Sequence, residues 1–226
     1  TSFGGISVMY SDGKINGSSG ASTRNEVDYI GLGVYNRKDM KNNFAVMYDV
    51  NFIHGKNDIK QNNSGVEVTA KPRTDAISGG FRFEKLIENN SGMFIPFAGL
   101  RYMHVEVDEY KNSIGLRYNT NKMNVVSLPV GLKATGKEVI KGNWGFKPYA
   151  ELGYVVNMGD TDNKVEVSFA GAHENFGYDV MDKGMLFTRL GFSLGNKNAV
   201  ISLGYDYTKS KNAHNNKWNV SANFTF

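Results

Sequence analysis

The C-terminal stretch Trp218-Asn219-Val220-Ser221-Ala222-Asn223-Phe224-Thr225-Phe226 decides the fold class. Every even-numbered position in it is apolar and every odd-numbered position is polar. Successive side chains of a β-strand point to opposite faces, so this strict alternation predicts a strand with one apolar and one polar face. A strand of this length can cross a bilayer when it is tilted, with its apolar side chains toward lipid and its polar side chains toward a lumen.

The same period of two returns in further stretches along the chain. They are clear at 44–52, 77–83, 94–102, 126–132, 146–154 and 199–207, and weaker at about 3–11, 27–35 and 187–194. Together with the C-terminal stretch, the pattern predicts ten strands.

The connections between the expected strands alternate in length. Long polar loops are expected at 12–25, 54–74, 108–123 and 159–184, an intermediate one at 209–217, and short turns near 36–39, 88–92, 136–143 and 195–198. This alternation puts the long loops at one rim of an antiparallel meander, as in outer-membrane barrels, whose extracellular loops are long and periplasmic turns short. The expected fold is therefore all-β: an antiparallel transmembrane outer-membrane β-barrel meander of about ten strands.

A soluble β-sandwich or a lipocalin-like barrel also shows one apolar face, so alternation alone does not exclude either. Two features favour the membrane. Aromatic residues at the rims of the apolar faces form the expected interfacial girdle; they are Tyr10, Tyr102, Trp144 and Tyr154, with Trp218 in the last strand. The opposite faces carry charges of both signs, which suits a hydrated lumen better than a dry core; these candidate pore-lining residues are Arg82, Arg101, Lys133, Glu151, Arg189 and Asp206.

Composition excludes several classes of protein and of site. The chain has 226 residues, with 26 Lys and Arg against 22 Asp and Glu, and the basic residues are scattered rather than gathered into a nucleic-acid footprint. No run of eighteen apolar residues occurs, which excludes a helical membrane protein. Zero cysteines exclude disulfides, a cysteine nucleophile and thiolate zinc sites. The four histidines lack metal-binding spacing, and no nucleophile-elbow or P-loop motif is present, so we expect no metal, no cofactor and no enzyme.

Several segments, in this order and spacing, resemble the autotransporter β-domain, the C-terminal translocator of type V secretion. They are Pro96–Tyr102, Leu128–Lys133, Lys147–Leu152, Gly159–Asn163, Val167–Gly171 and the last strand with its terminal Phe. The resemblance covers essentially the whole chain, so residues 1–226 are expected to form one β-domain. It implies a twelve-stranded barrel whose lumen is threaded by a helix leading to an N-terminal passenger. The best register places Gly4–Val8 at the third strand of the family, so the helix, the first hairpin and the passenger are expected to lie outside this chain.

The resemblance implies an anchor and export pore in the outer membrane of a Gram-negative bacterium. Its expected partners are outer-membrane lipid, the outer-membrane barrel assembly machinery and the passenger segment of the same protein. The six candidate pore-lining residues would contact the threaded segment, or would pair with one another and only stiffen the barrel. The last strand, with Trp218, Phe224 and Phe226, would be the signal that the assembly machinery reads by strand pairing at an edge, or an ordinary closing strand.

Two competing functions remain open at this point. A free-standing outer-membrane barrel would act as an adhesin or a pore through its loops, which are rich in Asn, Lys and Ser. A surface protease of the omptin type would need a histidine base held by a carboxylate at the extracellular rim. His104 with Asp108, or His173 with Glu174 and Asp179, are the candidates for such a pair.

Overall fold

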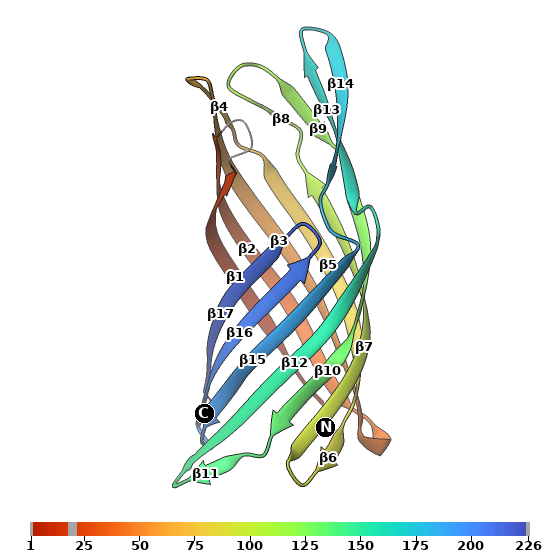
Figure 1. Ribbon diagram of the computed structural model, residues 1–226, viewed down its shortest axis with the longest axis vertical. Coiled ribbons are helices and arrows are strands. Elements are labelled where there is room, and N and C mark those ends of the chain that lie inside the picture. Colours follow the sequence, from red (N-terminus) through yellow and green to blue (C-terminus); the bar gives the residue numbers. More distant parts are fainter. Residues whose placement is uncertain (1, 18–21, 225–226) are drawn as a thin grey trace.

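The computed structural model describes residues 2–17 and 22–224, which form a curled sheet of antiparallel strands (Figure 1). Ten strands follow one another across this sheet. They are β1 (Ser2–Gly17), β2 (Ser22–Asp39), β3 (Phe44–Asn63), β5 (Arg73–Lys85), β7 (Gly92–Val107), β10 (Met123–Gly136), β12 (Trp144–Gly159), β15 (Gly184–Gly195), β16 (Ala199–Ser210) and β17 (His214–Phe224). The antiparallel meander of ten strands is thereby confirmed. Within the described residues no backbone pairing joins β1 to β17, the two end strands of this path.

Short connections gather at the lower end of Figure 1, where both chain ends also lie. A single turn of 3-10 helix, η1 (Lys41–Asn43), joins β2 to β3. The small strands β6 (Ile87–Asn89) and β11 (Val139–Lys141) pair with the starts of β7 and β12. Asn42 and Asn43 both have a φ of 59°, a left-handed conformation that Asn tolerates better than most residues. These are the turns that the sequence predicts as short.

At the opposite end, much of what the sequence predicts as long loops is strand, so that expectation was wrong. Pairing between β1 and β2 continues to Gly17 and Thr23, and β3 runs on to Asn63 before β4 (Val66–Ala70) turns back on it. A separate four-stranded sheet consists of β8 (Tyr110–Lys111), β9 (Arg117–Thr120), β13 (Asp162–Phe169) and β14 (Ala172–Asp179). These extensions are held by backbone pairing and by polar cross-strand contacts such as Asn25 Nδ2 to Asn57 Oδ1 at 3.1 Å. The extended ends of β1, β2 and β3 show no apolar alternation, whereas β4 and β13 do alternate, through Val66 and Val68 and through Val165 and Val167.

The convex face of the main sheet carries a band of exposed apolar side chains. Its members alternate along the strands with inward-facing residues and include Ile30, Leu32, Val34, Val50, Phe52, Phe81, Phe83, Leu100, Val130, Leu132, Leu152, Leu190 and Ile201. Tyr10, Tyr102, Trp144 and Tyr154, predicted as an aromatic girdle, are all exposed. Soluble monomers rarely expose an apolar patch of this extent, and outer-membrane strands do so toward hydrocarbon. That the four aromatic residues mark the membrane interfaces stays a prediction.

The concave face is filled by aromatic rings that lie over glycines of the next strand. A Cβ added to Gly131 would lie 2.6 Å from Cζ of Phe97, and one added to Gly153 would lie 2.5 Å from Cζ of Phe187. The two rings are 6.3 Å apart, and both side chains are buried. The glycines are therefore required by close approach, because any larger residue would displace these rings. Within the described part of the chain, no helix has the length and apolarity to cross a membrane.

Candidate functional site: a charged belt and a cavity on the concave face

The alternation that exposes the apolar band also places charged side chains on the concave face. Arg82 lies between Phe81 and Phe83 on β5, and Glu151 lies between Ala150 and Leu152 on β12. Each charged residue therefore points away from the convex face. These side chains meet in a connected row that we call the charged belt; it consists of Arg37, Asp39, Arg82, Glu84, Glu151, Arg189 and Asp206.

The centre of the charged belt is tightly paired and buried. Arg82 Nη1 donates to Glu151 Oε1 at 2.7 Å, and Arg82 Nε lies 2.9 Å from Glu84 Oε1. Arg37 Nη1 donates to the other oxygen of Glu84 at 2.6 Å. Glu84 and Glu151 are only 4% and 5% exposed. The guanidinium carbon of Arg82 lies 3.5 Å from the centre of the Phe97 ring, a cation–π contact.

The bond from Arg82 to Glu151 spans two intervening strands. β7 and β10 lie between β5 and β12, and the inward positions Gly99 and Gly131 on them lack side chains. Gly99 is opposite Arg82, while Gly131 is opposite Phe97 and lies under the ring of that residue. The Arg82 guanidinium lies over the Phe97 ring on the path to Glu151, so the contact depends on the curvature of the sheet and on this ring.

The far end of the charged belt is looser. Arg189 Nη1 lies 3.8 Å from Glu151 Oε1, and Arg189 Nε lies 3.7 Å from Asp206 Oδ2. Both distances are too long for a hydrogen bond but short enough for an ion pair. Asp206 accepts a hydrogen bond from Asn219 Nδ2 at 2.9 Å instead. The side chain of Arg189 is 49% exposed, against 22% for that of Arg82.

Two of the predicted pore-lining residues stand outside the charged belt. Arg101 pairs with Asp49 through one nitrogen, since its Nη2 lies 2.5 and 2.7 Å from the two carboxylate oxygens. Lys133 is the register partner of Glu151, but its Nζ lies 5.5 Å from the Tyr149 ring centre and forms no ion pair within the described residues. The other four predicted residues, Arg82, Glu151, Arg189 and Asp206, are brought together. That any of the six lines an open pore stays a prediction.

Sequence reasoning did not single out Arg37, Glu84 or Asp49. Arg37 falls in a segment predicted as a turn, but β2 continues through it to Asp39. Glu84 follows directly on the stretch 77–83 and continues its alternation by one residue. Asp49 belongs to the polar face of 44–52, so its direction was predictable although its pairing with Arg101 was not.

A cavity of about 800 Å³ adjoins the charged belt. Charged residues line part of it: Asp49, Arg82, Arg101, Glu151, Asp179, Asp182 and Arg189. Much of the rest of the lining is apolar and includes Met47, Phe97, Met103, Pro129, Val155, Val180, Met181, Met185 and Phe187. A concave, largely apolar site with a few polar groups is the usual form of a binding cavity.

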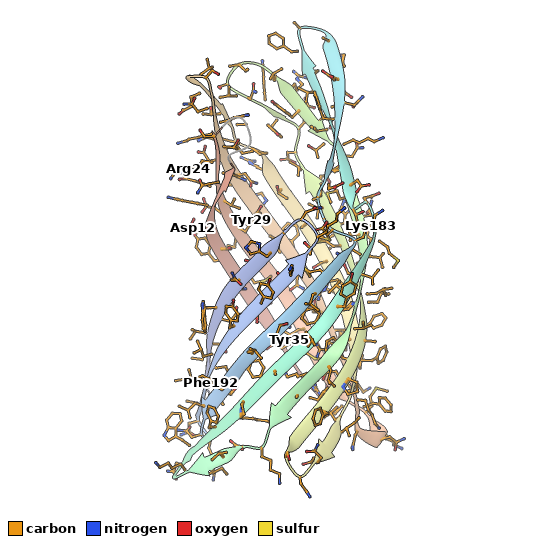
Figure 2. All side chains as sticks on the ribbon, viewed as in Figure 1. Asp12, Arg24, Tyr29, Tyr35, Lys183 and Phe192 are labelled. Carbon is orange, nitrogen blue, oxygen red and sulfur yellow. The ribbon has the colours of Figure 1, made fainter. Side chains whose placement is uncertain are left out.

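The segment between β14 and β15, residues 180–183, borders this cavity, and we call it the strap. Asn157 on β12 holds it, since its Nδ2 donates to the carbonyl of Asp182 at 2.8 Å and its backbone N–H to the carbonyl of Lys183 at 2.8 Å. Backbone N–H groups of Val180 and Met181 both donate to the carbonyl of Thr161. Lys183, labelled in Figure 2, is the last residue of the strap before β15 begins.

A two-bond latch ties the strap to the loop between β16 and β17. The backbone N–H and the side-chain Nδ2 of Asn212 donate to the two carboxylate oxygens of Asp182, each at 2.8 Å. Hydrogen bonding by Ser210 and Asn212, with the charge of Lys211, holds the pKa of the Asp182 carboxyl below its ordinary value. The latch is therefore made with the ionised carboxylate.

The histidines considered as catalytic bases have different partners from those that the sequence suggested. His104 Nδ1 lies 2.9 Å from Oδ1 of Asn124, an amide, rather than beside Asp108. His173 Nδ1 lies 2.9 Å from Oε1 of Glu166 on the exposed β13–β14 hairpin, and not beside Glu174 or Asp179. Within the described residues, no three acidic or histidine side chains gather as ligands for a metal ion.

Comparison with known proteins identifies the family. The family model named autotransporter beta-domain matches residues 2–213. The chain belongs to the autotransporter β-domain family.

Solved structures with the same fold are autotransporter domains. The β-domain of the Bordetella autotransporter BrkA has a TM-score of 0.64 at 15% identity, over 98% of this chain and 90% of that one. The transport unit of AIDA-I from Escherichia coli has a TM-score of 0.66 at 18% identity, over 100% and 76%. The translocator domain of NalP from Neisseria meningitidis has a TM-score of 0.71 at 15% identity, over 99% and 74%. No curated protein sequence matches the chain.

Membership places this β-domain among the outer-membrane translocators of type V secretion in Gram-negative bacteria. The predictions of family, outer-membrane barrel and translocator are confirmed. Neither the free-standing adhesin or pore nor the omptin-like protease is favoured. Autotransporter translocator domains are transport units.

Proposed function

We propose that residues 1–226 act as one β-domain that carries a passenger segment along its concave face, past the charged belt and through the adjoining cavity. The observation that carries this proposal is the cavity of about 800 Å³ bounded by Arg82, Glu151 and Arg189. A wet, charge-bearing interior behind an apolar outer band is the arrangement of an outer-membrane channel. The charges of the belt nearly balance, with three arginines and four carboxylates, so a chain of mixed composition meets no strong single-sign field.

The sequence left two roles open for the charged residues, namely contact with the transported segment and stiffening of the barrel. We propose that each role belongs to a different half of the charged belt. Glu84 and Glu151 are buried and hydrogen-bonded to Arg37 and Arg82 respectively, which supports a stiffening role. Arg189 is half exposed and loosely paired at the cavity, which supports contact with the transported segment. We therefore assign stiffening to the first half and contact to the second.

The convex face is proposed to contact outer-membrane lipid. Tyr102 donates its hydroxyl hydrogen to Asn124 Oδ1 at 2.6 Å, and Tyr205 donates to Asn216 Oδ1 at 2.8 Å. An aromatic ring on the apolar band with a hydrogen-bonded polar tip is the arrangement found at a membrane–water interface.

The last strand is proposed to be read by the outer-membrane barrel assembly machinery. β17 is an end strand whose pairing partner in the sheet is β16, and Trp218 on it is 68% exposed. An end strand offers backbone donors and acceptors for strand addition. Phe226 and the side chain of Phe224 lie outside the described residues, so their share in this signal stays a prediction.

Transport is proposed to proceed without catalysis by this chain. His104 pairs with an amide, and the pair of His173 and Glu166 is exposed on a hairpin rather than placed at the cavity. His104→Ala and His173→Ala are therefore expected to leave passenger display unchanged.

Surface display of a reporter tests the proposal. A signal peptide and an epitope-tagged segment are fused ahead of Thr1, and the tag is probed with antibody and external protease on intact Gram-negative cells. We expect the tag to be accessible from outside. A tag that stays in the periplasm, while the β-domain shows heat-modifiable mobility in the outer membrane, would contradict the proposed transport. Deleting residues 214–226 should instead abolish insertion itself, as required for the assembly signal.

A further inference from the structure

We propose that Arg189 is the docking point for a carboxylate of the transported segment. This inference rests on the proposed function and names the side-chain chemistry that the cavity recognises. Arg189 lies on β15, lines the cavity and is 49% exposed. Its guanidinium makes no hydrogen bond within the described residues, because its two acidic neighbours stand at 3.7 and 3.8 Å. An arginine with unused donors beside a cavity matches a carboxylate acceptor.

The neighbouring carboxylates do not satisfy Arg189 because other donors hold them. Glu151 accepts from Arg82 at 2.7 Å, and Asp206 accepts from Asn219 at 2.9 Å. Moving either one closer to Arg189 would weaken a shorter bond. An incoming carboxylate has no such competing partner, so it can form the bidentate pair that arginine favours.

Arg101 gives a comparison within the same cavity. It also lines the cavity, and 40% of its side chain is exposed, but both oxygens of Asp49 lie within 2.7 Å of its Nη2. Its charge is therefore already neutralised by a hydrogen-bonded carboxylate. The two arginines have similar exposure but differ in how their carboxylate neighbours hold them: Arg101 is hydrogen-bonded to Asp49, whereas Arg189 has only ion-pair distances of 3.7 and 3.8 Å. Arg101 is therefore the matched control for Arg189.

The rest of the lining defines what surrounds the carboxylate in the partner. Met185 and Phe187 stand on the same strand as Arg189, and Val155, Met103 and Met47 line other parts of the cavity. Methionine side chains adapt to apolar groups of different shape. The fitting segment therefore presents an acidic side chain flanked by apolar ones. Three of the other acidic groups of the lining, Asp49, Glu151 and Asp182, already accept hydrogen bonds within the protein and so do not select a basic segment. The fourth, Asp179, is the last residue of β14, opposite Asp162.

The test measures binding of synthetic peptides to the refolded β-domain in detergent micelles. Three fluorescent peptides of Leu, Ala and Ser differ only at one central position, which is Glu, Gln or Lys. We expect the Glu peptide to bind about tenfold more tightly than the Gln peptide, because a charge-assisted bidentate pair is about twice as strong as a neutral hydrogen bond. Arg189→Gln should remove this preference, whereas Arg101→Gln should keep it. Arg189→Lys should keep part of it, since it retains the charge without the planar fork.

Several results would overturn the assignment. They are a Glu preference that survives in Arg189→Gln, a preference lost equally in Arg101→Gln, and failure of the Glu peptide to bind the wild-type domain. Heat-modifiable mobility checks that each variant is folded, and Arg189→Lys provides a milder change if Arg189→Gln fails to fold. The display assay reports separately on the proposed function. Display without a Glu preference refutes the docking point alone, whereas loss of display in the unmodified β-domain refutes transport itself.

Discussion

Replacing Glu151 by alanine should destabilise the β-domain much more than replacing Asp206 at the other end of the charged belt. The carboxylate is 5% exposed and accepts the 2.7 Å bond from Arg82 Nη1. Removing it leaves the Arg82 charge without its partner from across the sheet. Breaking a buried ion pair from one side costs about 3–5 kcal/mol in a dry interior.

The expected cost for Glu151→Ala is lower than this, because Arg82 is not fully buried. The Arg82 side chain is 22% exposed and keeps Glu84 at 2.9 Å, so part of the lost attraction is replaced by water and by the remaining carboxylate. We expect Glu151→Ala to lower the free energy of unfolding by about 2–3 kcal/mol, which shifts the folded-to-unfolded ratio about 30- to 150-fold. Glu151→Gln keeps the volume and an acceptor and should cost about half as much.

The assay is urea unfolding in detergent micelles, followed by the fluorescence of the two tryptophans, Trp144 and Trp218. The unfolding free energy is obtained by linear extrapolation to zero urea. Asp206→Ala is the control within the charged belt, because its side chain is 25% exposed and its ion pair with Arg189 is 3.7 Å long; it should cost less than about 1 kcal/mol. The double-mutant cycle of Arg82→Ala with Glu151→Ala should give a coupling of about 2 kcal/mol.

Two results would contradict this prediction: Glu151→Ala and Asp206→Ala lower the free energy of unfolding equally, or the double-mutant cycle gives no coupling. Either result would mean that water reaches the centre of the charged belt and screens it as it screens surface pairs. The two halves of the charged belt would then not differ in role.

Three further outcomes are expected. Gly131→Val places a Cβ 2.6 Å from Cζ of Phe97 and should cut the folded, heat-modifiable fraction severalfold, whereas Gly13→Val, with nothing within 4 Å of its Cβ, should leave that fraction unchanged on the same gels. Asn212→Ala removes the side-chain latch bond from Nδ2 to Asp182 and leaves the backbone N–H bond, so it should increase the open fraction of single channels in planar bilayers about threefold. The pKa of Asp182 is lowered from 3.8 in the folded state, so the latch contributes fully above that value and is lost as the pH falls through the lowered pKa. Channel opening should therefore rise only below about pH 4, and Asp182→Asn should remove that pH dependence.

The sequence predicts the direction of a side chain better than its partner. Arg82 between two phenylalanines must point away from the apolar face, and the same reasoning holds for Glu151 and Arg189. That Arg82 meets Glu151, 69 positions away, depends on the register of four strands and on the curvature of the sheet. No local pattern contains that information.

Alternation also fails where both faces of a strand are polar. The end of β3 runs Lys56-Asn57-Asp58-Ile59-Lys60, where a strand and a solvated loop have the same composition. The paired strand forms there because β2 continues alongside it, with Asn57 opposite Val27 and Lys60 opposite Arg24. Backbone pairing with a neighbour, rather than apolar burial, decides the length of these strands.

The strap and Arg189, the loosely paired residue of the charged belt, border the same cavity. Asp182 in the strap is satisfied by Asn212, so it does not neutralise Arg189 across the cavity. Arg189 therefore keeps its unused donors while the strap is latched. A segment that enters the cavity can therefore gain the Arg189 contact while every latch bond is still made. A contact that is equally available in the latched and unlatched states does not shift the equilibrium between them, so docking at Arg189 and release of the strap are separate steps.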